Sequence, residues 1–173
     1  MSLIQTDHLN KHHTIYRFRQ LATGLLFTAF LFLASCKQKV SNAKEEHGNS
    51  TLELMNTDID FSKKCNTLGT QEAFMQMLDS NGVLLRQDRY PIAGGQTTDY
   101  LIENEDPSLH YSFVPSQAEV ASSGDLGYTY GIFKCHLQSA DTVYCGTYTH
   151  IWKRHNDGKW KLMLNTLNWG LGE

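Results

Sequence analysis

Extended segments alternate with turn residues throughout the second half of the chain, and this pattern constrains the fold more than any other feature. Short clusters of Gly, Asn, Asp and Ser separate runs that are rich in β-branched and aromatic residues. The predicted strands are Leu109–Val114, Gln117–Ala121, Leu126–Leu137, Val143–Arg154 and Lys159–Asn168. Strands that follow one another so closely form an antiparallel meander. The second half therefore predicts one continuous sheet.

The residues between about 50 and 104 carry helical periodicity instead. Leu52, Met55 and Ile59 lie at helical spacing and predict an amphipathic helix. Thr70 is expected to cap a second helix, which ends at Asn81-Gly82. The predicted elements of this half are helices from Leu52 to about Asn66, from Thr70 and over Gln96–Asn104, and a short strand over Val83–Leu85. Helices followed by strands indicate the α+β class.

Two hairpin turns predict which residues share a face of the sheet. Each turn ends in a glycine suited to the left-handed position of a three-residue loop, which pairs Ala121 with Asp125 and His155 with Lys159. The face expected to be buried beneath the helices carries Tyr128, Tyr130, Ile132, Tyr148, His150, Trp152, Trp160, Leu162, Leu164 and Asn168. The face expected to be exposed carries Thr129, Thr147, Thr149, Lys153, Lys159 and Lys161.

The cysteines raise the question of a disulfide. Strands paired symmetrically about Ala140 place Cys135 opposite Cys145, within reach of a cross-strand bridge. The alternative is two small, partly buried thiols. Cys65 lies in the first predicted helix, where it is expected to fill the core rather than act as a nucleophile.

Leu33-Ala34-Ser35-Cys36 follows an uncharged apolar run and resembles the lipobox of a bacterial lipoprotein signal peptide. The run, Leu21–Phe32, is shorter than the roughly 20 residues of a membrane-spanning helix, and basic residues precede it. We expect a signal peptide at 1–35, a lipidated Cys36 with a flexible tether over 36–50, and one domain over 51–173. The expected location is the cell envelope, anchored in the outer membrane and facing the periplasm or the exterior.

Charge and motif spacing exclude several classes of function. The chain has a formal net charge of -3, and its one basic cluster flanks a predicted hairpin turn, which argues against nucleic-acid binding. The histidines after residue 50 lack the spacing of metal ligands, and no glycine-rich phosphate loop or Gly-x-Ser-x-Gly elbow occurs. We therefore expect neither a metal nor a cofactor.

Four motifs of the second half carry a resemblance to a known family. They are Ser123–Gly131, Gly146-Thr147-Tyr148, Ile151-Trp152-Lys153 and Asp157–Lys161. Over about Met55 to Leu171 the chain resembles the ketosteroid isomerase-like, or nuclear transport factor 2-like, superfamily, and within it bacterial domains related to SnoaL-type polyketide cyclases. The resemblance implies a conical α+β barrel, in which a curved antiparallel sheet wraps around N-terminal helices as in a cystatin-like roll. It also implies a pocket at the open end and a homodimer.

The resemblance directs attention to ionisable and aromatic residues. Enzymes of the superfamily use a carboxylate or a histidine in an apolar cone as general base. His150, on the aromatic face, and Asp60, on the first helix, are the candidate bases here. Relatives often carry an acid at the position of Asn165, which the predicted register places on the outer face. Candidate pocket residues are Tyr90, Tyr111, Tyr128, Tyr130, Tyr148, His150, Trp152 and Asn168.

These observations favour a lipid-anchored envelope protein that binds a small apolar or aromatic molecule without chemistry. One alternative is an isomerase, dehydratase or cyclase that needs no metal or cofactor. Another is an envelope interaction or dimerisation module. An enzyme needs an ionisable group with a hydrogen-bonded neighbour inside the cone, whereas binding needs only a cavity. An interaction module needs a filled cone and an apolar outer patch.

Overall fold

The computed structural model describes residues 46–104, 106, 108–137 and 142–171. Apart from Glu46, these residues belong to the compact unit His47–Glu173. The expected signal peptide, the lipobox with Cys36 and the tether up to residue 45 lie outside the described residues. Among the helices of the described part, none has the length and apolar character needed to cross a membrane.

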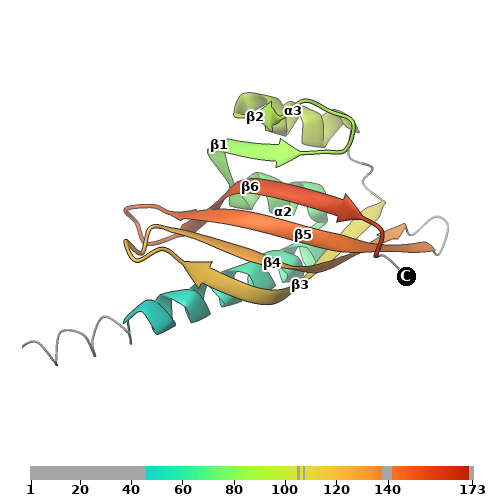
Figure 1. Cartoon of the computed structure of the whole chain (residues 1–173). Coiled ribbons are helices and arrows are strands. Elements are labelled where there is room, and N and C mark those ends of the chain that lie inside the picture. The colour runs from blue at the N-terminus through green and yellow to red at the C-terminus, as the bar shows by residue number, and fades with distance from the viewer. Residues whose placement is uncertain (1–45, 105, 107, 138–141, 172–173) are drawn as a thin grey trace, which may run out of the picture. The chain divides into compact units, whose positions relative to one another are not determined.

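One six-stranded sheet, covered on one face by helices, forms the domain (Figure 1). The strand order is β2-β1-β6-β5-β4-β3, with β1 parallel to β6 and every other neighbouring pair antiparallel. The elements are a first helix described over 46–68, α2 (Thr70–Met77), β1 (Leu78–Leu85), β2 (Ile92–Ala93), α3 (Gly95–Asn104), β3 (Leu109–Val120), β4 (Leu126–Leu137), β5 (Thr142–Arg154) and β6 (Trp160–Trp169). The predicted α+β class is confirmed.

The first helix buries a different stripe from the predicted one. Leu54, Asp58 and Phe61 are fully buried, whereas Leu52 is 61% exposed. The buried stripe is thus rotated by one residue, or about 100°, because the core selects the bulkier ring of Phe61. The helix also includes residues 46–50, which the sequence assigned to the tether.

Thr70 joins α2 to the sheet instead of capping the helix. Gly69, with φ of 89°, is the N-cap residue and makes no side-chain cap. The Thr70 hydroxyl donates to the backbone oxygen of Leu109 and accepts from the backbone N–H of Tyr111, both at 3.1 Å. The predicted capping role is wrong because β3 lies close enough to use that hydroxyl. The helix ends at Met77, and β1 begins at once.

The register of β4 against β5 differs by one residue from the predicted register. His150 pairs with Thr129, and Trp152 pairs with Gly127. The prediction assumed symmetry about Ala140, but the strands pair Leu137 with Thr142. Because side chains alternate between faces, this single step exchanges the two faces of β4.

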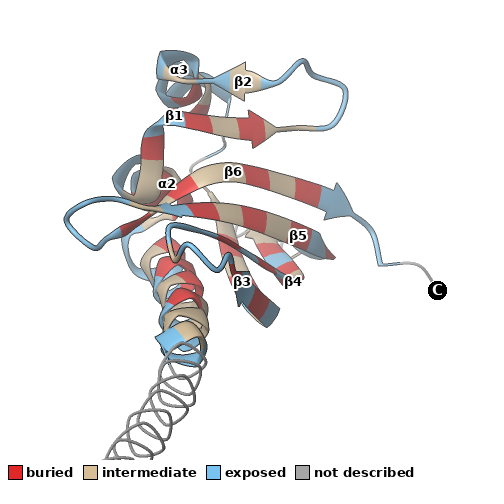
Figure 2. Cartoon of the chain, turned by 60° about the vertical axis from the view of Figure 1, so that its left-hand side comes forward, coloured by how far each residue is buried: buried red, intermediate tan, exposed pale blue. Residues whose placement is uncertain are grey.

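Buried residues alternate with less buried ones along β5 and β6 (Figure 2), and on β4 the exchange corrects several predictions at once. Tyr128 and Tyr130 are 43% and 42% exposed on the outer face, and Thr129 is fully buried. Ile132, which pairs with the exposed Thr147, also lies outside the buried face. Cys135 lies opposite Tyr144 and Cys145 opposite Lys134, and both cysteines are free, so of the two alternatives the structure shows separate thiols rather than a disulfide.

A bulge in β6 corrects a second group of predictions. The register shifts between Ile151 and Trp152, which leaves Met163 as an extra residue on β6. Asn165 therefore turns inward, opposite His150, and is fully buried. Leu164 and Asn168 turn to the outer face, contrary to the prediction.

The turns themselves are partly as predicted. The hairpin that pairs His155 with Lys159 is confirmed, with Gly158 at φ of 82°. In the other hairpin, the backbone N–H of Ala121 bonds to the oxygen of Leu126 rather than pairing with Asp125. The two strands predicted between 109 and 121 form the single strand β3, whose register shifts between Pro115 and Gln117.

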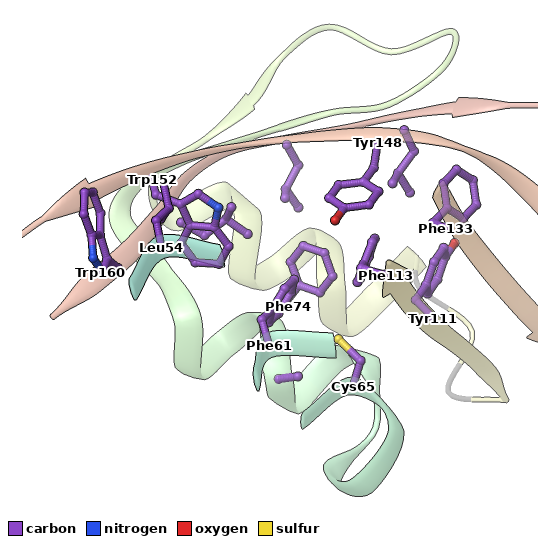
Figure 3. Close-up of a cluster of buried hydrophobic side chains, with 14 of the residues drawn as sticks. Leu54, Phe61, Cys65, Phe74, Tyr111, Phe113, Phe133, Tyr148, Trp152 and Trp160 are labelled. Carbon is purple, nitrogen blue, oxygen red and sulfur yellow. The ribbon is translucent and has the colours of Figure 1, made fainter. Parts of the chain in front are cut away.

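Aromatic side chains fill the space between the sheet and the helices (Figure 3). Phe61 contacts Phe74 and Phe113, with ring centroids 4.9 and 5.5 Å apart, and its edge meets Trp152. Burying one such side chain stabilises a fold by roughly 1.5–3 kcal/mol. The middle of the cone is therefore a packed core.

Candidate functional site

A carboxylate lies inside this aromatic core. Asp58 is fully buried on the first helix and contacts two side chains of β5. The Tyr148 hydroxyl donates to Oδ2 of Asp58 at 2.6 Å, and Nδ1 of His150 lies 2.7 Å from Oδ1. A buried carboxylate is costly without such partners. Asp58, Tyr148 and His150 are called the interior network below.

His150 is enclosed by rings. Its centroid lies 4.9 Å from that of Phe113, 5.4 Å from Phe61 and 5.6 Å from Trp152. Its second ring nitrogen, Nε2, is buried and has no hydrogen-bond partner within the described residues. The interior network thus presents one nitrogen that no described side chain satisfies.

Asn165 lies directly opposite His150 on the neighbouring strand. Its Oδ1 accepts a hydrogen bond of 2.6 Å from Nη1 of Arg86. Its Nδ2 is buried and, like His150 Nε2, lacks a partner in the described part of the chain. The guanidinium of Arg86 lies 6.0 Å from the ring centroids of Phe74 and Tyr100.

Protonation at two groups follows from their burial. Desolvation, reinforced by the charge of Asp58, raises the pKa of the Tyr148 hydroxyl, so this group stays a hydrogen-bond donor. The same two causes raise the pKa of the Cys65 thiol. A buried, protonated thiol is a poor nucleophile, which agrees with the expected core-filling role of Cys65.

An open pocket of about 450 Å³ lies where β1 and β6 end. Its lining mixes apolar, polar and cationic side chains. The lining residues are Leu85, Arg86, Gln87, Thr166, Leu167, Asn168 and Trp169. Arg86 therefore belongs to the pocket and also donates a hydrogen bond to Asn165, the cross-strand partner of His150.

The structure separates the predicted site residues into groups. Tyr111, Tyr148, His150 and Trp152 are at most 4% exposed in the core, and Asn168 lines the pocket. Tyr128 and Tyr130 lie on the outer face, and Tyr90 is 94% exposed between β1 and β2. Asp60 is exposed and pairs with Lys63 at 2.9 Å, so the carboxylate inside the cone is Asp58 instead.

Sequence reasoning missed Asp58 and Arg86, and it placed Asn165 on the outer face although this residue is fully buried. Asp58 has a detectable signal, since it continues a helical stripe with Leu54 and Phe61 that competes with the predicted stripe. Asn165 faces inward because of the bulge in β6, and no local sequence motif predicts that bulge. In the described part of the chain, no three His, Cys, Asp or Glu side chains are grouped to hold a metal ion.

Comparisons with known proteins bear on the fold. No protein-family model and no curated protein matches the chain. Solved structures do match it, among them a ketosteroid isomerase-like protein from Erwinia carotovora atroseptica, with a TM-score of 0.55 and 10% identity over 68% of this chain and 95% of that one.

Two further matches have similar statistics. A protein of unknown function with a cystatin-like fold from Nostoc punctiforme has a TM-score of 0.52 and 14% identity, over 69% of this chain and 90% of that one. The CamKII hub homology domain of Chlamydamonas reinhardtii has a TM-score of 0.51 and 14% identity, over 70% and 98%. Together with the curved sheet over N-terminal helices, these matches show that the domain has the ketosteroid isomerase-like, cystatin-like fold that its sequence motifs predicted.

Proposed function

We propose that the domain binds one small molecule in the pocket at the ends of β1 and β6. The observation that carries this proposal is the pocket itself, whose volume of about 450 Å³ suits a small organic ligand. Leu85, Leu167 and Trp169 offer apolar surface to an apolar or aromatic body, and Thr166 and Asn168 offer hydrogen bonds that orient it.

A ligand screen on the native chain and on a variant with a blocked pocket tests this proposal. Steroids, flavonoids, aromatic acids and polyketide-like compounds are added to the full-length chain while its Tm is measured. A compound that binds the folded state raises the Tm by mass action. We expect the rise to be lost in Asn168→Trp, which fills the pocket, and kept in Asn56→Trp, an exposed position of the first helix. A rise that persists in Asn168→Trp, or none across the panel, contradicts the proposal.

We propose further that a lipid on Cys36 holds this domain at the outer membrane, facing the periplasm or the exterior. The support is the lipobox sequence Leu33-Ala34-Ser35-Cys36 after its apolar run. Metabolic labelling with an alkyne fatty acid is expected to label the native chain and not Cys36→Ser. Label in both, or in neither, contradicts the anchor.

An acid–base enzyme is the second candidate, and the interior network favours it. Asp58 orients His150 through Nδ1, which leaves Nε2 to take a proton from a carbon next to a carbonyl. For any ligand found in the screen, we expect exchange of that carbon-bound proton in D₂O, followed by NMR. The exchange is lost in His150→Gln and kept in the control His155→Gln; equal rates in both variants argue against catalysis.

A homodimer through the outer face of the sheet is a third proposal. Val114, Leu126, Tyr128 and Tyr130 expose 42–60% of their surface on this face, and a hub homology domain shares the fold. Light scattering of the full-length chain is expected to give a dimer mass. Tyr130→Glu should give a monomer, and Tyr144→Glu, exposed near the end of the sheet, should not. A monomer in the native chain contradicts the proposal.

A further inference from the structure

Two buried polar atoms without a hydrogen-bond partner in the described residues lie on adjacent strands. They are Nε2 of His150 and Nδ2 of Asn165, both on side chains with no exposed surface. The two residues are directly opposed across β5 and β6. Opposed residues have Cβ atoms about 4.5–5.5 Å apart, so both atoms belong to one small region of the interior.

The hydrogen bonds of Asn165 Oδ1 and His150 Nδ1 determine whether Nδ2 and Nε2 are donors or acceptors. An arginine only donates, so Oδ1 of Asn165 faces Arg86 and Nδ2 is an amide donor. The carboxylate of Asp58 only accepts, so Nδ1 of His150 carries a proton. In the neutral ring, Nε2 is then an acceptor. The two opposed residues thus offer one donor and one acceptor.

A hydroxyl oxygen is the group that satisfies both atoms, because it accepts from Nδ2 and donates to Nε2. A carbonyl oxygen satisfies only the amide, and an ammonium group satisfies only the ring. We propose that His150 and Asn165 form an internal subsite for one hydroxyl oxygen. Water supplies that oxygen in the ligand-free protein, and the hydroxyl of a small molecule replaces it when the pocket is occupied.

Arg86 connects this subsite to the pocket. It lines the pocket and holds the amide of Asn165, and the next residue of β6, Thr166, is also a lining residue. A flat molecule in the pocket therefore has a short path to the subsite. The ligand part of the inference rests on the proposed binding function, whereas the water part does not.

A high-resolution crystal structure of the ligand-free, full-length chain tests the water part. The expected result is one density peak about 2.7–3.2 Å from both Nε2 of His150 and Nδ2 of Asn165. A direct hydrogen bond between those two atoms overturns the proposal. So does an apolar contact that leaves no room for an oxygen.

Ring ¹⁵N NMR of His150 with 2-naphthol and 2-methylnaphthalene tests the ligand part, since these probes differ only in the hydroxyl. We expect 2-naphthol to bind about tenfold more tightly and to shift the Nε2 resonance, the effect of one added neutral hydrogen bond. Binding that moves the Trp169 indole signal but not His150 overturns the ligand part. A water peak without binding of either probe supports the subsite and counts against the pocket function, so the two failures are distinguishable.

Asn165→Asp supplies a matched variant, because it replaces the amide donor by an acceptor and keeps the contact with Arg86. The control Asn56→Asp makes the same change at an exposed position of the first helix, away from the pocket. The first variant is expected to lose the tenfold preference for 2-naphthol, because a hydroxyl has only one proton to donate to two acceptors, and the control to keep it. Urea unfolding confirms that each variant folds. A preference for 2-naphthol that survives in Asn165→Asp contradicts the proposal.

Discussion

Two aspartate–histidine pairs among the described residues differ mainly in their surroundings. Asp58 and His150 meet at 2.7 Å inside the aromatic core, and neither side chain is exposed. Asp79 and His155 meet at 2.5 Å where the β5–β6 hairpin reaches β1, and the His155 side chain is 44% exposed. The first pair is therefore fully enclosed, whereas in the second pair the histidine is in contact with water and the Asp79 side chain is only 5% exposed.

The difference teaches that burial determines how much free energy of unfolding is lost when one partner of such a pair is removed. Removing one partner in the interior leaves the other charged or polar group unpaired in an apolar medium, which is strongly destabilising. At the edge, water replaces a missing partner at small cost. The stability effects of substitution should thus fall as exposure rises, and four substitutions test this order.

The largest effect is expected for Asp58→Ala. It leaves the Tyr148 hydroxyl and Nδ1 of His150 without their acceptor, and we expect a loss of about 3–5 kcal/mol in the free energy of unfolding. Urea unfolding measures it. Asp60→Ala, two residues away and exposed, should stay within about 0.5 kcal/mol. Equal effects in the two variants would show that Asp58 is not paired in the core.

Tyr148→Phe should have the next largest effect. It removes one donor from Asp58 and keeps the ring, so we expect a loss of about 1–3 kcal/mol. The matched change Tyr130→Phe removes an exposed hydroxyl that bonds to Gln117 at 3.2 Å and should be nearly neutral. Chemical denaturation of both variants makes the comparison, and a neutral Tyr148→Phe would contradict the interior network.

Asp79→Asn should cost about 1 kcal/mol at neutral pH, as expected for a hydrogen bond beside water. The backbone N–H of Asn81, followed by His155, lowers the pKa of Asp79. A lowered folded-state pKa stabilises the fold above the unfolded-state value and loses that effect as the pH falls through the folded-state value. The native chain and the variant should therefore converge in stability below about pH 4. A gap that widens in acid would contradict this assignment.

The smallest effect is expected for Glu53→Gln. Arg154 donates to both carboxylate oxygens of Glu53, at 2.9 and 2.7 Å, but the two side chains are 32% and 44% exposed. We expect a loss of about 0.2–1 kcal/mol that diminishes at high salt. A loss as large as that of Asp58→Ala would show that burial does not set the order.

Most elements of the fold were predictable because their signals are local. The limits of β4 and the third helix match the prediction to within one residue. Tyr148, His150 and Trp152 were correctly placed on one buried face, because alternation within a single strand needs no knowledge of its neighbours.

The site was less predictable because it depends on pairings between strands. A one-residue difference in the β4–β5 register moved Tyr128 and Tyr130 to the outer face. One bulge in β6 brought Asn165 opposite His150 and turned Asn168 outward, to the rim of the pocket. Neither the register difference nor the bulge changes the local composition, so neither can be detected from the hydrophobic periodicity of the sequence.

The sequence by itself determined the α+β class, the order of the elements and the family resemblance, since periodicity, turn residues and short motifs act over a few positions. The tertiary structure alone decided that Asp58 rather than Asp60 is the interior carboxylate. It also decided that His150 and Asn165 share one region beside the pocket. The physical reason is that the helix phase and the strand registers are selected by the collective packing of the aromatic core, in which every ring constrains the position of the others.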